Sequence, residues 1–172
     1  KDSKNSYLRD IFVFASFTAL SFVDIKELSN DQIVEVNGEK WIISKRHKTG
    51  VPFQVKLLDI PLQIIERYKA FQENNLVFPN LNYWSICKRM GKMIKECGIT
   101  KKISFHCSRH GFATLALSKG MPIESVSRIL GHTNIETTQI YAKITVQKLD
   151  NDLTMLGDKL SKSFGNVKMA GI

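Results

Sequence analysis

The sequence of 172 residues is poor in cysteine and has no long apolar run. Its three cysteines are an odd number, and none of them forms a C-x-x-C pair: Cys87, Cys97 and Cys107. This pattern predicts reduced thiols in a cytoplasmic setting rather than a disulfide framework. No apolar segment approaches the length of a bilayer span, and no signal peptide opens the chain, so a membrane protein is not expected.

Acidic residues are also scarce, because 16 Asp and Glu face 25 Lys and Arg, for a formal net charge of +9. An excess of this size favours a polyanionic partner such as nucleic acid, or an anionic membrane surface. The missing apolar span makes the membrane the poorer choice. Repeats and low-complexity tracts are absent, and the length fits one domain, or one domain with a short appendage. The chain opens at Lys1 without a methionine, so we expect a part excised from a longer protein.

Apolar periodicity predicts a mainly α fold with a small antiparallel three-stranded sheet, in the α+β class. In 7–20, the residues Leu8, Ile11, Phe12, Ala15 and Ala19 share one helical face. Strands are expected at 32–36, 39–46 and 52–57, with Asn37-Gly38 as the first hairpin turn. Further helices are expected from near Asp24 and at 60–74, 82–97, 106–118, 122–130, 134–141 and about 145–162. The helix at 82–97 would bury the stripe Ile86, Met90, Ile94 and Cys97.

One stretch concentrates the side chains that carry chemistry: His106, Arg109, His132 and Tyr141. On a helix, His106 and Arg109 share a face, since they are three residues apart. Histidine and arginine can grip a phosphodiester, and a tyrosine hydroxyl can attack it. The segment HCSRH also suggests a metal site of His106 and His110, with Cys107 between them. However, a catalytic zinc site needs a third ligand and usually a glutamate base, and neither is placed nearby.

The H-x-x-R box, the L-G-H box and the downstream tyrosine closely resemble, in order and spacing, the catalytic boxes of tyrosine recombinases of the phage-integrase type. The resemblance covers about residues 8–160. It implies a site-specific DNA recombinase or integrase of a mobile element, with Tyr141 as the nucleophile that forms a 3′-phosphotyrosine. It further implies that Arg109 and His132 hold the phosphate, and that His106 either donates a hydrogen bond to it or exchanges a proton with the nucleophile. No cofactor or metal is implied. The implied location is the cytoplasm of a bacterial cell or of the host of a mobile element.

Two further features of the resemblance concern catalysis at the phosphate. Lys48, in KRHKTG, is similar to the hairpin lysine of the family that protonates the leaving 5′-oxygen. The family motif T-G-L-R-x-S-E-[LI] reads TALSFVDI here, so Ser21 stands where the first active-site arginine is expected. A subgroup among integrases of conjugative transposons resembles this chain in lacking it. Arg46 is a candidate substitute, because on an extended hairpin its side chain would leave the same face as Lys48. Ser21 itself is the competing candidate.

Positive charge also lines two other segments, and these are expected to contact the DNA backbone: Lys45 and Arg46 in the hairpin, and Lys88, Arg89, Lys92 and Lys95 on the helix at 82–97. A solvated helix face is the plainer explanation. Duplex DNA with attachment sites is the partner implied by the family.

The expected organisation is a catalytic domain over 1–172, with a core at about 8–144, a C-terminal packing helix at 145–164 and a loose tail at 165–172. We expect the N-terminal DNA-clamping domain that is usual in the family to be absent from this chain. The C-terminal helix repeats apolar residues at helical spacing: Val146, Leu149, Leu153, Leu156 and Leu160. It could pack on its own domain, or on a neighbouring protomer in a DNA-bound tetramer. Two other functions remain open: a catalytically inactive DNA-binding relative and a type IB topoisomerase.

Overall fold

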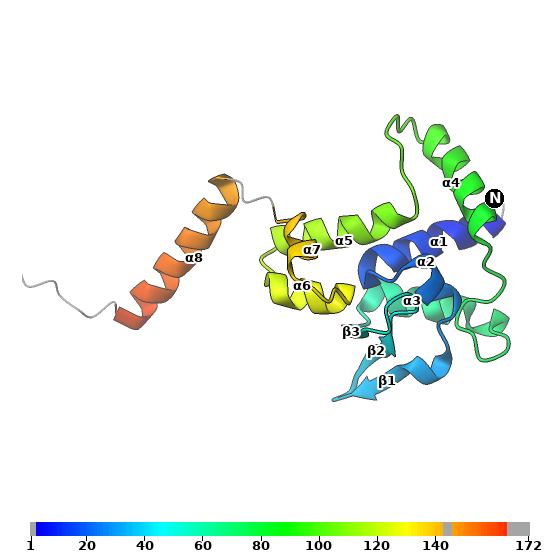
Figure 1. Ribbon diagram of the computed structural model, residues 1–172, viewed down its shortest axis with the longest axis horizontal. Coiled ribbons are helices and arrows are strands. Elements are labelled where there is room, and N and C mark those ends of the chain that lie inside the picture. The colour runs from blue at the N-terminus through cyan, green and yellow to red at the C-terminus, as the bar shows by residue number, and fades with distance from the viewer. Residues whose placement is uncertain (1–2, 143–145, 165–172) are drawn as a thin grey trace, which may run out of the picture. The chain divides into compact units, whose positions relative to one another are not determined.

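The computed structural model describes residues 3–142 and 146–164, which form mainly helices and one small sheet (Figure 1). They divide into two compact units, Lys1–Tyr141 and Ala142–Ile172. The first unit contains the sheet and most helices: α1 (Ser3–Thr18), α2 (Phe22–Lys26), the 3₁₀ turn η1 (Asn30–Gln32), β1 (Ile33–Val36), β2 (Glu39–Lys45), β3 (Pro52–Lys56), α3 (Asp59–Tyr68), the 3₁₀ turn η2 (Lys69–Phe71), α4 (Tyr83–Glu96), α5 (His106–Ser118), α6 (Ile123–Leu130) and α7 (Glu136–Gln139). The second unit contains α8 (Val146–Phe164).

The sheet is antiparallel in the order β1-β2-β3. Its first turn pairs Val36 with Glu39 across Asn37 and Gly38, which take positive φ angles of 52° and 76°. Asn and Gly tolerate this conformation, so the predicted hairpin turn is confirmed. β2 pairs with β3 as far as Lys45 and Pro52, and a turn at 47–49 connects the two strands.

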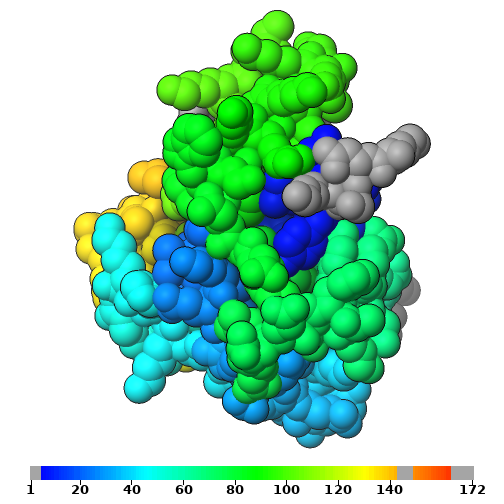
Figure 2. All heavy atoms as spheres, turned by 90° about the vertical axis from the view of Figure 1, so that its right-hand side faces the viewer, coloured from blue at the N-terminus to red at the C-terminus, as the bar shows by residue number. Residues whose placement is uncertain are grey.

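The core of the first unit is built around α1, which packs against α3, α4 and α5. Figure 2 shows the face on which α4 lies over the N-terminal part of α1. The side chains of Ile11, Phe14 and Ala15 are fully buried on α1, and the Phe14 ring meets the Phe78 ring edge to face at 4.8 Å. α1 ends because Ala19 takes a left-handed backbone conformation with φ of 57°. This turn directs the chain into α2, next to α5.

The mainly helical fold with a three-stranded antiparallel sheet is confirmed, while several element boundaries were wrong. α1 begins at Ser3, and it buries Phe14 more completely than Phe12. The helix expected over 60–74 ends at Tyr68 and continues only as η2, and the one expected over 134–141 is the single turn of α7. Cys97 is exposed, because α4 ends at Glu96 and its apolar stripe ends with it. The tail predicted at 165–172 lies outside the described residues, as do residues 143–145. In the described part of the chain, no helix has both the length and the apolar character needed to span a bilayer.

Candidate active site

Arg109 lies one turn into α5, with its guanidinium buried between two other elements. Its Nη1 donates to the Ala19 carbonyl at 2.8 Å, and its Nη2 donates to the Leu130 carbonyl at the end of α6. The left-handed turn at Ala19 and the end of α6 supply these acceptors because their carbonyls have no partner within a helix. A guanidinium has more N–H groups than these two bonds use. Arg109 also lines a cleft of about 510 Å³ together with His106 and Ser21.

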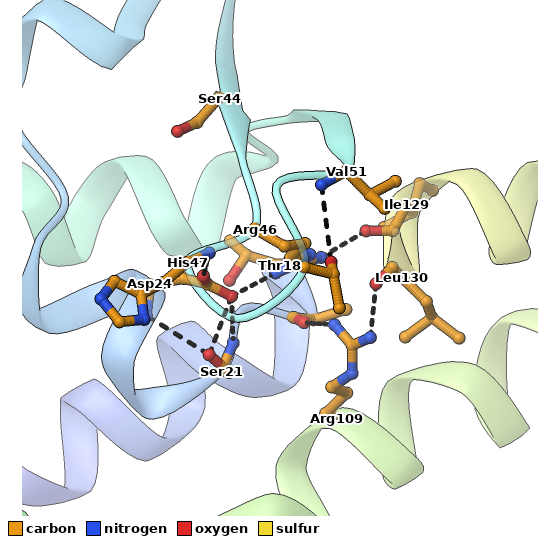
Figure 3. A network of polar contacts seen from close by, with 12 residues as sticks. Thr18, Ser21, Asp24, Ser44, Arg46, His47, Val51, Arg109, Ile129 and Leu130 are labelled. Atoms are coloured by element: carbon orange, nitrogen blue, oxygen red, sulfur yellow. Dashed lines mark hydrogen bonds and ion pairs between the residues drawn. The ribbon is translucent and has the colours of Figure 1, made fainter. Parts of the chain in front are cut away.

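Arg46 directly follows β2 and is buried, with 6% of its surface exposed. Its Nη1 contacts the Asp24 carboxylate at 2.7 Å, and its Nη2 donates to the Ile129 carbonyl. The guanidinium also stacks on the Phe53 ring, 3.9 Å from its centre. Arg46 and Arg109 therefore bind consecutive carbonyls at the end of α6, and Figure 3 shows the two side chains arriving there from different elements.

Ser21 does not lie free in the site, because it is the N-cap of α2. Its hydroxyl donates to the Asp24 carboxylate at 2.8 Å and accepts the Asp24 backbone N–H at 3.3 Å. The Asp24 carboxylate accepts the Ser21 N–H in return, which completes a capping box. Asp24 thus links the position where the family arginine is expected to Arg46.

His132 follows Gly131, the left-handed C-cap of α6 with φ of 61°. Its Nδ1 shares a hydrogen bond of 2.9 Å with the hydroxyl of Thr138 on α7, which is fully buried. This bond fixes the imidazole and leaves Nε2 for another partner. Gly131 is required for space as well as for its φ angle: a Cβ there would lie 2.8 Å from Cγ of Arg46.

Tyr141 lies just beyond α7, and its N–H donates to the Thr138 carbonyl at 3.0 Å. Its half-buried ring faces the His110 ring at 5.2 Å between centres, and His110 in turn contacts His106 at 4.3 Å. His106 opens α5 and is exposed. His110 on α5 therefore connects the ring of Tyr141 with that of His106, which is three residues before Arg109 on the same helix.

The charged and titratable groups of the site influence one another's pKa values. Burial and then the Arg46 charge lower the pKa of Arg109 to about 10. Burial lowers the pKa of His132 as well, followed by the charges of Arg109 and Arg46. Burial raises the pKa of Tyr141, while the Arg109 charge opposes this rise. The site therefore holds two crowded cations, a neutral His132 near pH 7 and a protonated tyrosine, and an anion placed there would relieve the repulsion between the arginines.

Asp24 supplies the negative charge that balances Arg46. Burial alone would raise its pKa, but the N–H of His47, the Arg46 guanidinium and Ser21 together lower it. Asp24 is therefore ionised at neutral pH and forms a buried ion pair with Arg46.

Lys48 and Lys45 lie outside this buried cluster. Both are exposed, Lys45 at the end of β2 and Lys48 in the turn at 47–49. The expectation that Arg46 and Lys48 leave the same face of an extended hairpin was wrong, because the strand ends at Lys45 and Arg46 points into the protein. Lys45 and Arg46, which were grouped as contacts for the DNA backbone, differ in burial, since Lys45 is exposed and Arg46 is buried.

The basic face of α4 is largely open to solvent. Lys88, Lys92 and Lys95 are exposed, and the Lys88 ammonium lies 5.4 Å from the centre of the exposed Trp84 ring. Arg89 is half-buried, and its Nη1 donates to Asn5 on α1 at 3.1 Å. These residues line a shallow groove along α4, with Arg89 facing α1 rather than projecting with the lysines.

Over 3–142 and 146–164, no group of three His, Cys, Asp or Glu side chains could hold a metal ion. The segment HCSRH therefore brings its two imidazoles together without further ligands from the described residues. Asp24 and Thr138 were not predicted as parts of the site, and His110 was considered only as a metal ligand. Asp24 had a signal, because it occupies the acidic position of the T-G-L-R-x-S-E-[LI] motif. Thr138 and the backbone carbonyls had none.

Comparison with known proteins agrees with this geometry. Residues 1–148 match the phage integrase family. Tyrosine recombinase XerA of Thermococcus kodakarensis is 41% identical over 141 residues, which cover 73% of this chain and 48% of that protein. XerA of Pyrococcus horikoshii is 31% identical over 139 residues, which cover 73% of this chain and 47% of that protein. The chain thus spans about half the length of these relatives.

Solved structures show the same fold at lower identity. The XerH site-specific recombinase bound to palindromic difH substrate, in a post-cleavage complex, superimposes with a TM-score of 0.71 at 22% identity, over 91% of this chain and 48% of that one. The Tn1549 transposon integrase in complex with circular intermediate DNA gives 0.70 at 17% identity, over 89% and 59%. With a family match over most of its length and this fold, the chain belongs to the phage integrase family.

Proposed function

We propose that this chain is the catalytic part of a site-specific DNA recombinase, which cleaves and rejoins strands through a covalent 3′-phosphotyrosine on Tyr141. The observation that carries this proposal is the convergence of Arg109 and Arg46 on consecutive carbonyls of α6, beside His132 and Tyr141. Two adjacent guanidinium groups form a site for a phosphodiester, whose charge they would share. The tyrosine is the nucleophile of this cluster.

In the proposed reaction, the Tyr141 oxygen attacks the scissile phosphorus while the bond from phosphorus to the 5′-oxygen breaks. The two arginines and Nε2 of His132 donate hydrogen bonds to the phosphate oxygens, where negative charge grows in the transition state. The neutral His106 accepts the tyrosine proton, and burial followed by the charges of His110 and Arg109 lowers its pKa. The released 5′-hydroxyl of a second strand reverses these steps and rejoins the DNA. This chemistry calls for no metal or cofactor.

Arg46 takes the place of the first arginine in this proposal, and Ser21 does not. Arg46 is anchored on Asp24 and Ile129, next to Arg109, so its charge reaches the site from β2 instead of from α2. The Ser21 hydroxyl is occupied by the capping box, and a hydroxyl carries no charge to offer a phosphate. Arg46 is therefore a phosphate-binding residue rather than a surface contact for the DNA backbone.

Lys48 is the proposed general acid for the leaving 5′-oxygen. Its exposed position in the turn at 47–49 lets a long, flexible side chain reach DNA that lies over the arginines.

The exposed lysines are proposed to bind the backbone of duplex DNA on either side of the site. Lys45 lies on the hairpin, and Lys88, Lys92 and Lys95 lie on α4, which leads through 97–105 into His106. Arg89 would support α1 and α4 there. The excess of positive charge in the chain suits this partner, because phosphate contacts release counterions. Such a partner would place the protein with cellular DNA, in the cytoplasm of a bacterial cell or of the host of a mobile element.

The second unit is proposed to join neighbouring protomers into a tetramer on paired DNA sites. α8 leaves Leu149, Leu153, Leu156 and Leu160 exposed, at spacings that form one apolar stripe. An exposed stripe of this kind indicates a protein contact.

Covalent capture tests the function without knowledge of the target sequence. The chain is incubated with a pool of nicked duplexes of randomised sequence, and DNA that stays attached after denaturation is sequenced. We expect mass spectrometry to find the DNA on Tyr141, and Tyr141→Phe to give no adduct. Tyr83→Phe, at an exposed tyrosine on the cleft that His106 lines, is the matched control and should keep the adduct.

The outcomes also separate the two other functions. DNA binding without any adduct would indicate an inactive DNA-binding relative. An adduct together with relaxation of supercoiled DNA, but without exchange between paired captured sites, would indicate a type IB topoisomerase. An adduct that persists in Tyr141→Phe would remove Tyr141 from its role.

A further inference from the structure

His110 contacts both the candidate nucleophile and the candidate proton acceptor, although it belongs to neither the phosphate grip nor the core. Its ring centre lies 5.2 Å from that of Tyr141 and 4.3 Å from that of His106, which it meets edge to face at 89°. The two histidines are one turn apart on α5, so the helix itself fixes their contact. One half-buried imidazole therefore bridges the two groups between which a proton must pass.

We propose that His110 is a positioning residue for strand cleavage, which holds the Tyr141 ring beside the arginines and sets the surroundings of His106. This inference rests on the proposed function in one respect, the role of Tyr141 as nucleophile. It goes further by assigning a task to a histidine outside the H-x-x-R and L-G-H boxes.

Tyr141 needs a side-chain contact to hold its ring, because few interactions hold its backbone in place. It follows the four-residue helix α7, and its N–H donates to Thr138. Next to it, Ile140 is 63% exposed and contributes little packing. Within the described residues, His110 provides the one ring contact of Tyr141. Contacts of this kind between rings change an equilibrium by up to about tenfold, so His110 can select the position of the tyrosine.

The contact with His106 adds an electrostatic effect. Two imidazoles this close disfavour a charge on both, and His110 follows burial among the causes that lower the pKa of His106. A neutral His106 can accept the proton that Tyr141 loses. Other titratable or charged groups also lie near these histidines: Arg109 on α5 interacts with His106, Tyr141 contacts His110, and Lys26, Glu27 and Tyr83 line the cleft that His106 borders. Because these stay in place, replacement of His110 isolates its contribution.

Two variants of the chain separate the ring from the charge. His110→Ala removes both, whereas His110→Phe keeps a ring and removes the charge. Leu115→Ala, at an exposed position on the same helix, is the control. NMR of the DNA-free chain follows the titration of His106 and the ring signals of Tyr141, and single-turnover adduct formation on a nicked duplex enriched from the randomised pool gives the cleavage rate.

We expect the pKa of His106 to rise in both His110 variants, because a like charge is removed. The Tyr141 signals should shift in His110→Ala and not in Leu115→Ala. Cleavage by His110→Ala should fall about tenfold with the Kd for DNA within about twofold, the scale of a lost ring contact. His110→Phe should recover most of the rate at pH 8, with the acid limb of its pH profile moved to higher pH.

Cleavage by His110→Ala at the wild-type rate would overturn the proposal, whatever the titration shows. Equal losses in folded His110→Ala and His110→Phe would overturn the role of the ring. Unchanged titration of His106 would overturn the electrostatic part. If the wild-type chain forms no adduct on any duplex, the proposed function fails instead, while the NMR measurements still decide whether His110 sets the place of Tyr141 and the proton affinity of His106.

Discussion

Replacement of Arg46 by lysine should disable cleavage while leaving a folded protein. Alanine is the wrong choice, because it would leave the Asp24 carboxylate, whose side chain is only 6% exposed, without its ion-pair partner. The free energy of unfolding would then fall by about 3–5 kcal/mol. That is a large part of the roughly 5–15 kcal/mol by which a domain is stable. Lysine keeps a charge beside Asp24, but its single nitrogen cannot also reach the Ile129 carbonyl. We expect a loss of about 2 kcal/mol in the free energy of unfolding, the size of one bond from a charged donor.

The effect on cleavage should be larger than the effect on folding suggests. Arg46→Lys removes one preorganised donor from the phosphate, which lowers the rate by about 10²-fold. Urea unfolding gives the stability, and single-turnover adduct formation at saturating protein on a captured nicked duplex gives the rate. Lys45→Ala is the matched control, because it removes the neighbouring exposed charge. It should weaken DNA binding in a salt-dependent way and leave the saturated rate nearly unchanged.

Three results would refute this reasoning in different ways. A rate for Arg46→Lys within threefold of wild type would show that Arg46 only holds the fold. Equal losses at saturation in Arg46→Lys and Lys45→Ala would mean that general positive charge is responsible. Ser21→Ala should cost about 1 kcal/mol of stability as a lost N-cap and little cleavage. A severe loss of cleavage there would favour direct contact of Ser21 with the phosphate.

Three further predictions concern the neighbours of the site and the fold. Gly131→Ala places a Cβ 2.8 Å from Cγ of Arg46 at a residue with a left-handed backbone, which should lower the free energy of unfolding by about 1–2 kcal/mol and, by displacing a preorganised donor, slow adduct formation at least about tenfold. Gly111→Ala, with open space around it, is the control and should keep the rate. A normal rate in Gly131→Ala would show that phosphate binding tolerates displacement of Arg46. Lys48→Ala should cleave poorly at a normal 5′-oxygen but recover with a 5′-sulfur leaving group, which needs little protonation, and absence of rescue would limit Lys48 to DNA positioning. Burial would raise the pKa of Asp10, but hydrogen bonds from Arg9, Tyr68 and Arg67 lower it, so the stability that Asp10 contributes is present above the ordinary aspartate pKa of about 4 and lost as the pH falls below it. In urea unfolding, Asp10→Asn should lower the free energy of unfolding by about 1–3 kcal/mol at pH 7, and its stability should fall less steeply at acid pH than that of the wild type. An equally steep fall in Asp10→Asn would contradict this.

The sequence predicted the fold class and the elements that carry strong local signals. Asn37-Gly38 specifies a hairpin turn by backbone conformation alone, and the breakers Gly120 and Gly131 delimit α5 and α6. The inference failed at Lys48, where strand geometry ends at Lys45, because a turn is not extended by the periodicity of the strand before it.

The remaining parts of the site could not be predicted because their partners are backbone atoms or distant side chains. Nothing local in the sequence marks the carbonyls of Ile129 and Leu130 as acceptors for two arginines more than twenty positions away. The bond between His132 and Thr138 depends on the angle between α6 and α7, which the left-handed turn at Gly131 sets. Such contacts follow from tertiary packing, and local pattern carries little information about it.

If Arg46 replaces the first arginine as we propose, the anchors of the site explain how a side chain from another part of the sequence reaches the same place. A guanidinium here needs a buried carboxylate and a free carbonyl, and Asp24 and Ile129 supply both at fixed positions. Two positions lie close enough to this carboxylate to carry an arginine. One is position 21, at the start of α2, and the other is position 46, which follows β2. The glycine of the L-G-H box then acquires a second reason for its identity, because a Cβ at Gly131 would fill the space that an arginine from β2 requires. On the proposed role of Arg46, the geometry of the acceptors fixes the place of the positive charge, and the strand or helix that delivers it is secondary.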